Sequence, residues 1–301
     1  MKTIVNVGKP IYSFSKEHKP VCRVKAGEHL TVEAYDCFEN QITSSETEIN
    51  NIDWSRINPA TGPIYVETAQ PGDTLAVTIH HIDINDRGVL VTGPDLGIMG
   101  HRIDEFAVKV LPIKNETALF NKKVHIPLNK MIGVIGVAPK DKAVSCGTPG
   151  NHGGNLDTRL ITEGATVYFP IFHEGALFGL GDMHAAMGDG EVGVSGIEVA
   201  GKADITIDVI KGKKIKHPIV VNEEGLSILV SADTIDEAVQ VAVEEMVDLL
   251  LPYLDISLSE LTMLMSAIGQ TQISQIVDPK LTARFFVPKW FFNTYQIELF
   301  K

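Results

Sequence analysis

The stretch that decides the expected fold is residues 165–191, ATVYFPIFHEGALFGLGDMHAAMGDGE. Residues 165–172 have the apolar and aromatic character of a strand, and residues 176–180 are similar. His173, Glu174 and Gly175 stand between these two segments and favour a turn. We therefore expect a hairpin whose second strand ends where residues 181–191 begin.

Residues 181–191, GDMHAAMGDGE, combine acidic and histidine side chains with small residues. This composition suits a tightly turned polar loop and is unfavourable inside a helix or strand. Asp182 and His184 are two residues apart, so on an extended backbone they point the same way and suit one cation. Asp189 and Glu191 repeat the spacing with carboxylates, which suits a further ligand or a general base. A polar turn without chemistry is the alternative.

The rest of the chain is predominantly β in pattern up to about residue 230, as in TLAVTIHHIDI at residues 74–84. Capping boxes at residues 234–237 (TIDE) and 257–260 (SLSE) then begin two helices, the second predicted over residues 261–276. We predict a β-rich α+β fold with short-strand sandwich or barrel-like sheets and a C-terminal antiparallel helix pair. Residues 1–301 would form a single β-rich catalytic unit, with the helical element at about residues 234–276 packed on it.

Charge, apolar runs and cysteine count each exclude a class of partner or site. The formal net charge is −12. No dense run of Lys or Arg offsets it, so we expect no nucleic-acid partner. The first residues lack a signal-peptide apolar core, and no apolar run approaches the roughly 18 residues of a membrane span, so we expect a cytoplasmic protein with no membrane partner. The odd cysteine count, without a C-x-x-C spacing, argues against a disulfide framework or a thiolate zinc site.

A second glycine-rich loop, residues 145–157 (SCGTPGNHGGNLD), gathers further polar side chains. They are Cys146, His152, Asn155 and Asp157. The backbone angles open to Gly153 and Gly154 could turn amide N–H groups toward one point, as in an oxyanion hole. The alternative is a wide turn in which the glycines serve geometry alone.

A catalytic zinc needs three protein ligands and an open position, so one ligand must come from outside residues 181–191. Asp36, His152 and Asp157 are the candidates, although an aspartate in the setting of Asp36 more commonly forms a turn. Residues 88–102 (GVLVTGPDLGIMGHR) lack the phosphate-loop pattern and are predicted to be a surface or active-site loop.

Several long motifs resemble one known family. GDMHAAMGDGEV at residues 181–192, NHGGNLD at 151–157, SGIE at 195–198 and ISQIVDP at 273–279 are similar to the acetamidase/formamidase family. The resemblance runs from DCFENQI at residues 36–42 to Pro288. It implies hydrolysis of short-chain amides to a carboxylate and ammonia, in a β-rich fold with a helical element. It also implies a cytoplasmic protein that is commonly oligomeric, so we expect a homo-oligomer, a dimer or higher.

The resemblance also implies a site. Carried over to this chain, its residues are His152, Gly153, Gly154, Asn155 and Asp157 from one loop, and Asp182, His184, Asp189, Gly190 and Glu191 from the other. The chain departs from the family pattern at Met187, where Gln is usual, and near Phe38 and Glu39, where a small pair is usual. The first departure puts substrate choice in doubt more than the type of reaction.

Our leading hypothesis is a metal-dependent amidohydrolase acting on formamide, acetamide or a similar amide. Asp36, Asp182 and His184 would hold a divalent cation, zinc in preference to calcium. Glu191 would be the general base, with His152 and Asp157 as further catalytic residues. The residues expected to bind substrate are Gly153, Gly154, Asn155 and Asp189. Two alternatives stay open: covalent catalysis by Cys146 with His152 as its base, and a non-catalytic small-molecule binding protein of the same fold.

Overall fold

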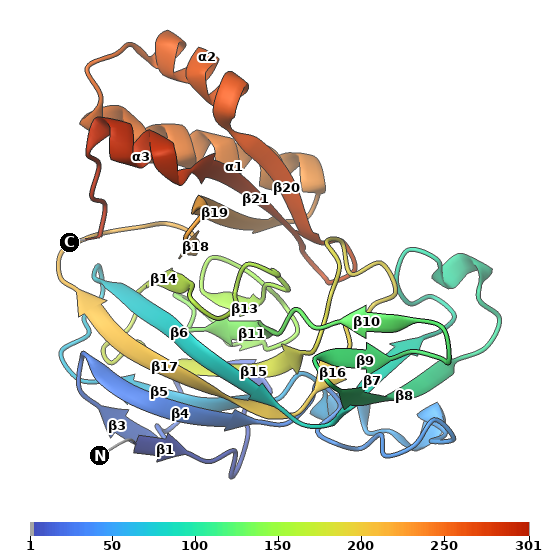
Figure 1. Cartoon of the computed structure of the whole chain (residues 1–301). Helices are drawn as coiled ribbons and strands as arrows, with labels where there is room; N and C mark the ends of the chain where they lie inside the picture. Colours follow the sequence, from blue (N-terminus) through green and yellow to red (C-terminus); the bar gives the residue numbers. More distant parts are fainter. Residues whose placement is uncertain (1–2, 301) are drawn as a thin grey trace.

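Two β-sheets and a C-terminal group of helices make up the computed structural model, which describes residues 3–300 (Figure 1). In spatial order, the first sheet contains β1 (Thr3–Val5), β4 (Glu28–Ala34), β17 (Gly201–Ile210), β6 (Thr74–Ile84), β14 (Thr166–Pro170), β18 (Ile219–Val221), β19 (Gly225–Ala232), β21 (Leu281–Pro288) and β20 (Gln270–Gln275). The β-rich α+β class expected from the sequence is confirmed.

The second sheet packs against one half of the first. Its strands, in order, are β10 (His125–Pro127), β9 (Thr117–Leu119), β8 (Ala107–Lys114), β7 (Arg87–Thr92), β16 (Glu198–Val199), β15 (Phe178–His184), β11 (Met131–Gly136) and β13 (Gly153–Asn155). In addition, β5 (Ala60–Val66) pairs with β15, and β3 (Cys22–Val24) pairs with β5. A small separate ladder joins β2 (Ser13–Phe14) to β12 (Val144–Ser145).

The alternating pattern of β6 shows how the sandwich core forms. Leu75, Val77 and Ile79 are fully buried and belong to the cluster that also holds Ile132 and Ile135 of β11 in the opposite sheet. Full burial of one such side chain contributes about 1.5–3 kcal/mol. The period-two pattern thus gives each sheet one apolar face, and the two faces close on each other.

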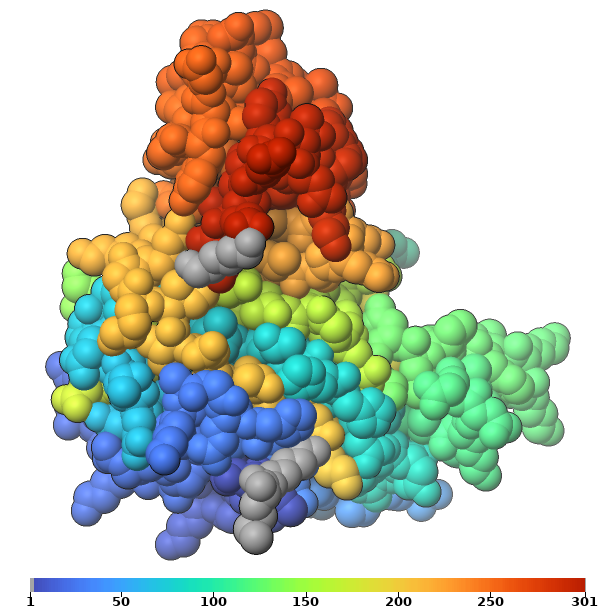
Figure 2. Space-filling view, turned by 60° about the vertical axis from the view of Figure 1, so that its left-hand side comes forward, coloured from blue at the N-terminus to red at the C-terminus, as the bar shows by residue number. Residues whose placement is uncertain are grey.

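The other half of the first sheet is covered by α1 (Ile235–Leu250), α2 (Leu258–Ile268) and α3 (Lys289–Tyr295). Ala238, Ala242 and Met246 of α1 recur every four residues and are fully buried in a second apolar cluster with β19 and β21. Figure 2 shows the segment from α1 to α3, which includes β20 and β21, coloured orange to red and standing above the strands of the sandwich; we call it the C-terminal layer. Four short 3-10 turns complete the regular structure, at Ile49–Asn51, Trp54–Arg56, Gly100–Arg102 and Leu251–Tyr253.

Both predicted helix starts are present, but the predicted end of the second helix is wrong. Thr234 accepts a hydrogen bond from the Glu237 N–H, and Ser257 and Glu260 form a complete capping box. The second helix ends at Ile268, followed by Gly269 as its C-cap, and Gln270–Gln275 forms β20 instead of continuing the helix to residue 276. Pairing of β20 with β21 outweighs the apolar spacing that suggested a longer helix.

The expected hairpin between residues 165–172 and 176–180 is also wrong, because β14 and β15 lie in different sheets. β14 pairs with β6 and β18, whereas β15 pairs with β11, β5 and β16. Ala176 and Leu177 take left-handed backbone angles (φ 57° and 58°) where the chain crosses from one sheet to the other. Residues 181–184, expected in a loop, are the end of strand β15.

Across residues 3–300, none of the helices combines the length and apolar character that spanning a membrane requires.

Candidate active site

Strand β11 brings the two glycine-rich segments together. On one side its residues pair with β13, where Val134 lies opposite Asn155. On the other side they pair with β15, where Met131 lies opposite His184 and Val134 opposite Gly181. The loop that begins with Ser145 and the segment around His184 therefore meet across one strand, in place of the expected hairpin.

Five side chains converge beside this strand, and we call them the acidic centre: Asp157, Asp182, His184, Glu191 and Glu198. From His184 Nε2, the nearest carboxylate oxygens are Glu198 Oε2 at 3.1 Å and Asp182 Oδ1 at 3.4 Å. Asp157 Oδ1 lies at 3.7 Å and Glu191 Oε1 at 3.9 Å. All five residues are buried, with at most 6% of their surface exposed. Four carboxyl groups thus surround one imidazole away from water.

Two glycines make room for these side chains. A Cβ built on Gly133 of β11 would lie 2.4 Å from Asp157 Oδ1 and 2.8 Å from Asp182 Oδ2. A Cβ on Gly196 would lie 2.5 Å from His184 Nδ1. Any side chain at residue 133 or 196 would clash with the acidic centre, which explains glycine at both positions.

The backbone itself is strained at the acidic centre. Asp157, Asp182 and Glu191 have left-handed φ angles of 37°, 51° and 49°. Such conformations cost about 1–3 kcal/mol each in non-glycine residues and cluster at functional sites. Three of the five side chains thus owe their direction to backbone angles that the surrounding sheet must enforce.

Burial and mutual charge set the protonation of the group. Burial raises the pKa of Asp157 to about 7, and the nearby Asp182 charge adds to the effect. Burial likewise raises the pKa of Glu191 and of Glu198 well above the usual range. Burial opposes charge on His184, but the carboxylates of Glu198 and Asp182 outweigh it and raise the pKa of His184 well above its ordinary value. The electrostatic environment of the acidic centre therefore favours bound positive charge.

Several atoms of the centre lack hydrogen-bond partners among the described residues. They are both carboxylate oxygens of Asp157, Asp182 Oδ1, Glu198 Oε2 and both ring nitrogens of His184. Buried polar atoms are nearly always paired, so a cluster of unpaired ones indicates an absent ligand. Ligand atoms of Asp157, His184 and Glu191 lie within 4.8 Å of one another, as do those of Cys37, Asp182 and Glu198. Imidazole nitrogen with carboxylate oxygen suits a divalent cation such as zinc.

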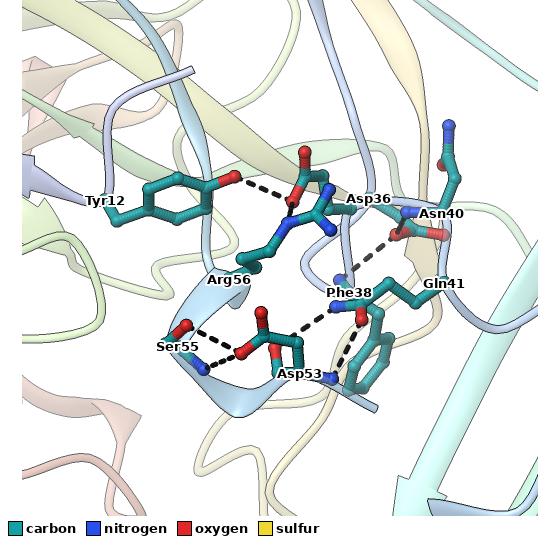
Figure 3. Close-up of polar contacts among 9 residues, drawn as sticks. Tyr12, Asp36, Phe38, Asn40, Gln41, Asp53, Ser55 and Arg56 are labelled. Carbon is teal, nitrogen blue, oxygen red and sulfur yellow. Dashed lines mark hydrogen bonds and ion pairs between the residues drawn. The ribbon is translucent and has the colours of Figure 1, made fainter. Parts of the chain in front are cut away.

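The structure does not bring Asp36 or Asp189 into the acidic centre. Asp36 Oδ1 accepts hydrogen bonds from the N–H groups of Phe38 (3.1 Å) and Asn40 (2.6 Å), so this carboxylate closes its own turn (Figure 3). Burial raises the pKa of Asp36 to about 6 despite these bonds. Asp189 Oδ2 instead accepts a hydrogen bond from Arg284 Nη2 at 2.7 Å.

Residues 152–155 differ in whether they lie near the acidic centre. The His152 ring is buried edge-on against Phe14, outside the acidic centre, and burial lowers its pKa to about 4. The Gly153 N–H already donates to Gly150 O at 3.1 Å, which removes it from a simple oxyanion hole. Asn155 does border the same cavity as Asp182, and its Nδ2 donates to Asp278 Oδ2 at 3.0 Å.

Sequence reasoning missed two carboxylates, Glu198 and Asp278. Glu198, on β16, is closer to His184 than any other carboxylate of the centre. Asp278 follows β20 and borders the cavity beside Asn155. Both lie inside the motifs SGIE and ISQIVDP, so the signal was present in the sequence without a role attached to it.

A cavity of about 370 Å³ ends on the acidic centre, with Asp182, Glu191 and Glu198 in its wall. Cys146 does not line it, although Ser145 and Gly147 do. Cys146 is fully buried, its thiol lies 3.6 Å from the Ile11 carbonyl oxygen, and burial raises its pKa far above the usual range. A thiol in this setting stays protonated and is a poor nucleophile.

Comparison with known proteins agrees with these features. The sequence profile of the Acetamidase/Formamidase family matches residues 13–145 and 141–294. A formamidase of Methylophilus methylotrophus is 26% identical over 262 residues, covering 66% of this chain and 64% of that protein. The chain thus spans less than two thirds of that relative's length.

Two crystal structures are similar over nearly the whole chain. One is described as a predicted acetamidase/formamidase from Thermoanaerobacter tengcongensis. It has a TM-score of 0.97 and is 50% identical, and the match covers 99% of each chain. The other, an acetamidase of Bacillus halodurans, has a TM-score of 0.96 and is 38% identical, with 98% of this chain and 100% of that one covered.

Proposed function

This chain belongs to the acetamidase/formamidase family, and on that premise we propose that it hydrolyses short aliphatic amides to a carboxylate and ammonia. The observation that supports the proposal most strongly is the acidic centre itself. Four buried carboxyl groups and one imidazole, many of their atoms unpaired, stand at the end of a cavity large enough for such a substrate. Burial of this kind is costly and indicates a chemical role.

We propose that Asp182, His184 and Glu198 hold a divalent cation, with zinc preferred over calcium because one ligand is an imidazole. Glu198 replaces Asp36 in this assignment, since the Asp36 carboxylate is engaged in its own turn. When bound, a divalent cation supplies Lewis acidity, which favours ionised water and polarises a carbonyl. The protein's part is to orient the reactants and to move protons.

Glu191 is the residue we assign to proton transfer. Its Oε1 accepts a hydrogen bond from the Gly196 N–H at 2.8 Å, which orients the carboxylate toward the cavity that Glu191 lines. Glu191 takes one proton from the attacking water while oxygen bonds to the amide carbon. It then gives that proton to the nitrogen as the carbon–nitrogen bond breaks, so that ammonia leaves.

Asp157 supports this arrangement from the other loop. Asp157 Oδ1 lies 3.7 Å from His184 Nε2. After burial, the Asp157 charge is the next cause that raises the pKa of Glu191. A negative neighbour keeps a carboxyl group basic, which favours proton uptake by Glu191. Because Asp157 comes from the sandwich and Asp278 from the C-terminal layer, we propose that residues 1–301 act as one catalytic unit.

Ammonia release from formamide and acetamide tests the proposal. The wild-type chain should release one ammonia for each carboxylate formed. Glu198→Gln should lower turnover at least about a hundredfold, because a cation ligand is lost. Glu174→Gln, the same change at an exposed position that bonds Tyr65, should not alter it. No ammonia from any short amide, or full turnover in Glu198→Gln, would contradict the assignment.

A further inference from the structure

The cavity that ends on the acidic centre has two chemically different parts. Its charged lining residues are all acidic and gather at the reacting end: Asp182, Glu191, Glu198 and Asp278. Most of the remaining wall is apolar, with Phe38, Trp54, Ile57, Val91, Leu96 and Val194, beside the polar side chains of Asn58, Ser145, Thr148, Asn155 and Ser195. An amide positioned for hydrolysis would therefore extend its substituent along an apolar surface.

The volume exceeds what the smallest amides need. Acetamide has four heavy atoms, which at about 30 Å³ for each water-sized group occupy on the order of 120 Å³. The cavity measures about 370 Å³. Acetamide would leave most of the apolar wall in contact with water, whereas a longer apolar group would cover it.

Polar contacts hold the turn that carries Phe38, one residue of the apolar wall (Figure 3). Glu39 Oε2 accepts hydrogen bonds from Tyr12 (2.7 Å) and Arg56 (2.6 Å), and Asp36 closes the turn that carries Phe38. Phe38 is 5% exposed, so its ring is fixed in the wall, whereas Trp54 is 41% exposed and marks the mouth. A wall fixed in advance binds with less loss of conformational entropy.

Another part of the wall comes from two loops that are hydrogen-bonded to each other. The Ile98 N–H donates to the Val192 carbonyl at 2.9 Å, and a Cβ on Gly97 would lie 2.6 Å from that same oxygen. Leu96 and Val194 reach the cavity from these two loops. Of the glycine-rich segment at residues 88–102, expected to be a surface or active-site loop, residues 88–92 are part of strand β7, so that expectation is wrong there. The part that follows β7 is irregular and borders the cavity through Leu96.

From these observations we propose that the preferred substrates are primary amides with an apolar acyl group of about four to seven carbons. This inference rests on the proposed amidase function and adds a substrate class to it. The acyl group lies between Phe38 and Leu96, with its carbonyl at the acidic centre. Each methylene that the wall covers raises kcat/KM by about fourfold, until the chain reaches Trp54.

Measurement of kcat/KM by ammonia release over formamide, acetamide, butyramide, hexanamide and benzamide tests the proposal. The wild-type chain should prefer hexanamide to acetamide by roughly 250-fold, because the four additional methylenes contribute about fourfold each. Leu96→Trp should abolish that preference by filling the wall, so that kcat/KM falls far more for hexanamide than for acetamide, because a bulky group blocks mainly the longer acyl chain. Ile98→Trp is the matched control, since Ile98 is on the same loop, 45% exposed and outside the cavity lining.

Three results would overturn the substrate class. They are equal kcat/KM for acetamide and hexanamide, equal effects of Leu96→Trp on both substrates, and a preference for N-alkyl acetamides over primary amides. In each case amide hydrolysis itself would stand. No turnover of any amide would overturn the proposed function, and this inference with it.

Discussion

The two halves of residues 181–191 reach the acidic centre in different ways. Asp182 and His184 belong to β15, whose backbone pairs with β11 on one side and with β5 and β16 on the other. Glu191 follows after the strand has ended, where Gly190 bridges to Gln275 at the end of β20. The first half is held by the sandwich and the second by the C-terminal layer.

The contacts to the C-terminal layer are specific. The Gly190 N–H donates to Ser274 O at 2.7 Å, and the Ile276 N–H donates to Gly190 O at 3.1 Å. Beside them, the buried Arg284 bonds Asp189. The proposed cation ligands Asp182 and His184 therefore lie on a paired strand of the sandwich. The proposed proton-transfer residue, Glu191, is positioned by contacts to the C-terminal layer. Substitutions should therefore separate the two functions.

His184→Ala, in the strand half, should have the largest effect. Loss of the imidazole removes a proposed ligand and the only basic side chain of the acidic centre. Because Lewis-acid assistance contributes several kcal/mol, turnover should fall on the order of 10³- to 10⁵-fold. Metal content should fall with it, measured by mass spectrometry of the purified chain. His81→Ala is the matched control, because His81 is an exposed residue of β6 that pairs with Glu163. Retained metal in His184→Ala would break the comparison.

Glu191→Gln, in the loop half, should reduce kcat by about 10²- to 10⁴-fold, since an amide cannot take the proton from water. The metal content should stay at the wild-type level, because Glu191 is not one of the proposed ligands. Parallel measurement of kcat and bound metal checks this outcome. Loss of the metal together with kcat would assign Glu191 to the ligands and erase the distinction between the halves.

Arg284→Met should have a smaller effect on the same half. Without the guanidinium, Asp189 loses its bond and the loop that carries Glu191 loosens, so kcat should fall about 10- to 100-fold with the metal retained. Arg284 acts as a positioning residue, so the double variant with Glu191→Gln should be no slower than Glu191→Gln alone. A thermal melt separates this from general unfolding. Fully additive losses would show that Arg284 acts by another route.

Cys146→Ala should have the smallest effect on activity. The thiol is buried in a small apolar cluster with Phe14, Ala60 and Val134, away from the cavity lining. Turnover should stay within about twofold, and the free energy of unfolding should fall by about 1 kcal/mol. Kinetics with acetamide and a denaturant titration measure the two quantities. A large loss of kcat in a stable variant would revive the covalent alternative.

Much of the architecture was predictable from local pattern. The alternation in residues 74–84 and the caps at Thr234 and Ser257 depend on neighbours in sequence, and the structure has a strand and two helix starts there. Asp182 and His184 both reach the acidic centre, as expected, but the left-handed φ of Asp182 means that the spacing rule for an extended strand does not by itself explain it. The resemblance to a family pointed to Asp157 and Glu191, which lie in the acidic centre, and also to His152 and Asp189, which do not.

What failed depends on tertiary structure. Asp189 and Glu191 were expected on one face, but Gly190 and Glu191 have left-handed φ angles of 96° and 49°, and alternation holds only in extended backbone. The hairpin failed because burial carries β14 and β15 into different sheets, which adjacency in sequence does not reveal. Glu198 joins the centre through pairing of β16 with β15, a contact with no local spacing signal.

The proposed amide hydrolysis depends most directly on a cation bound at the acidic centre. Dialysis of the wild-type chain against a chelator, with metal content and acetamide turnover measured on the same samples, tests this. We predict that both quantities fall together and that about one zinc per chain restores them, whereas calcium does not. Full turnover of acetamide by a chain freed of detectable metal would contradict the account.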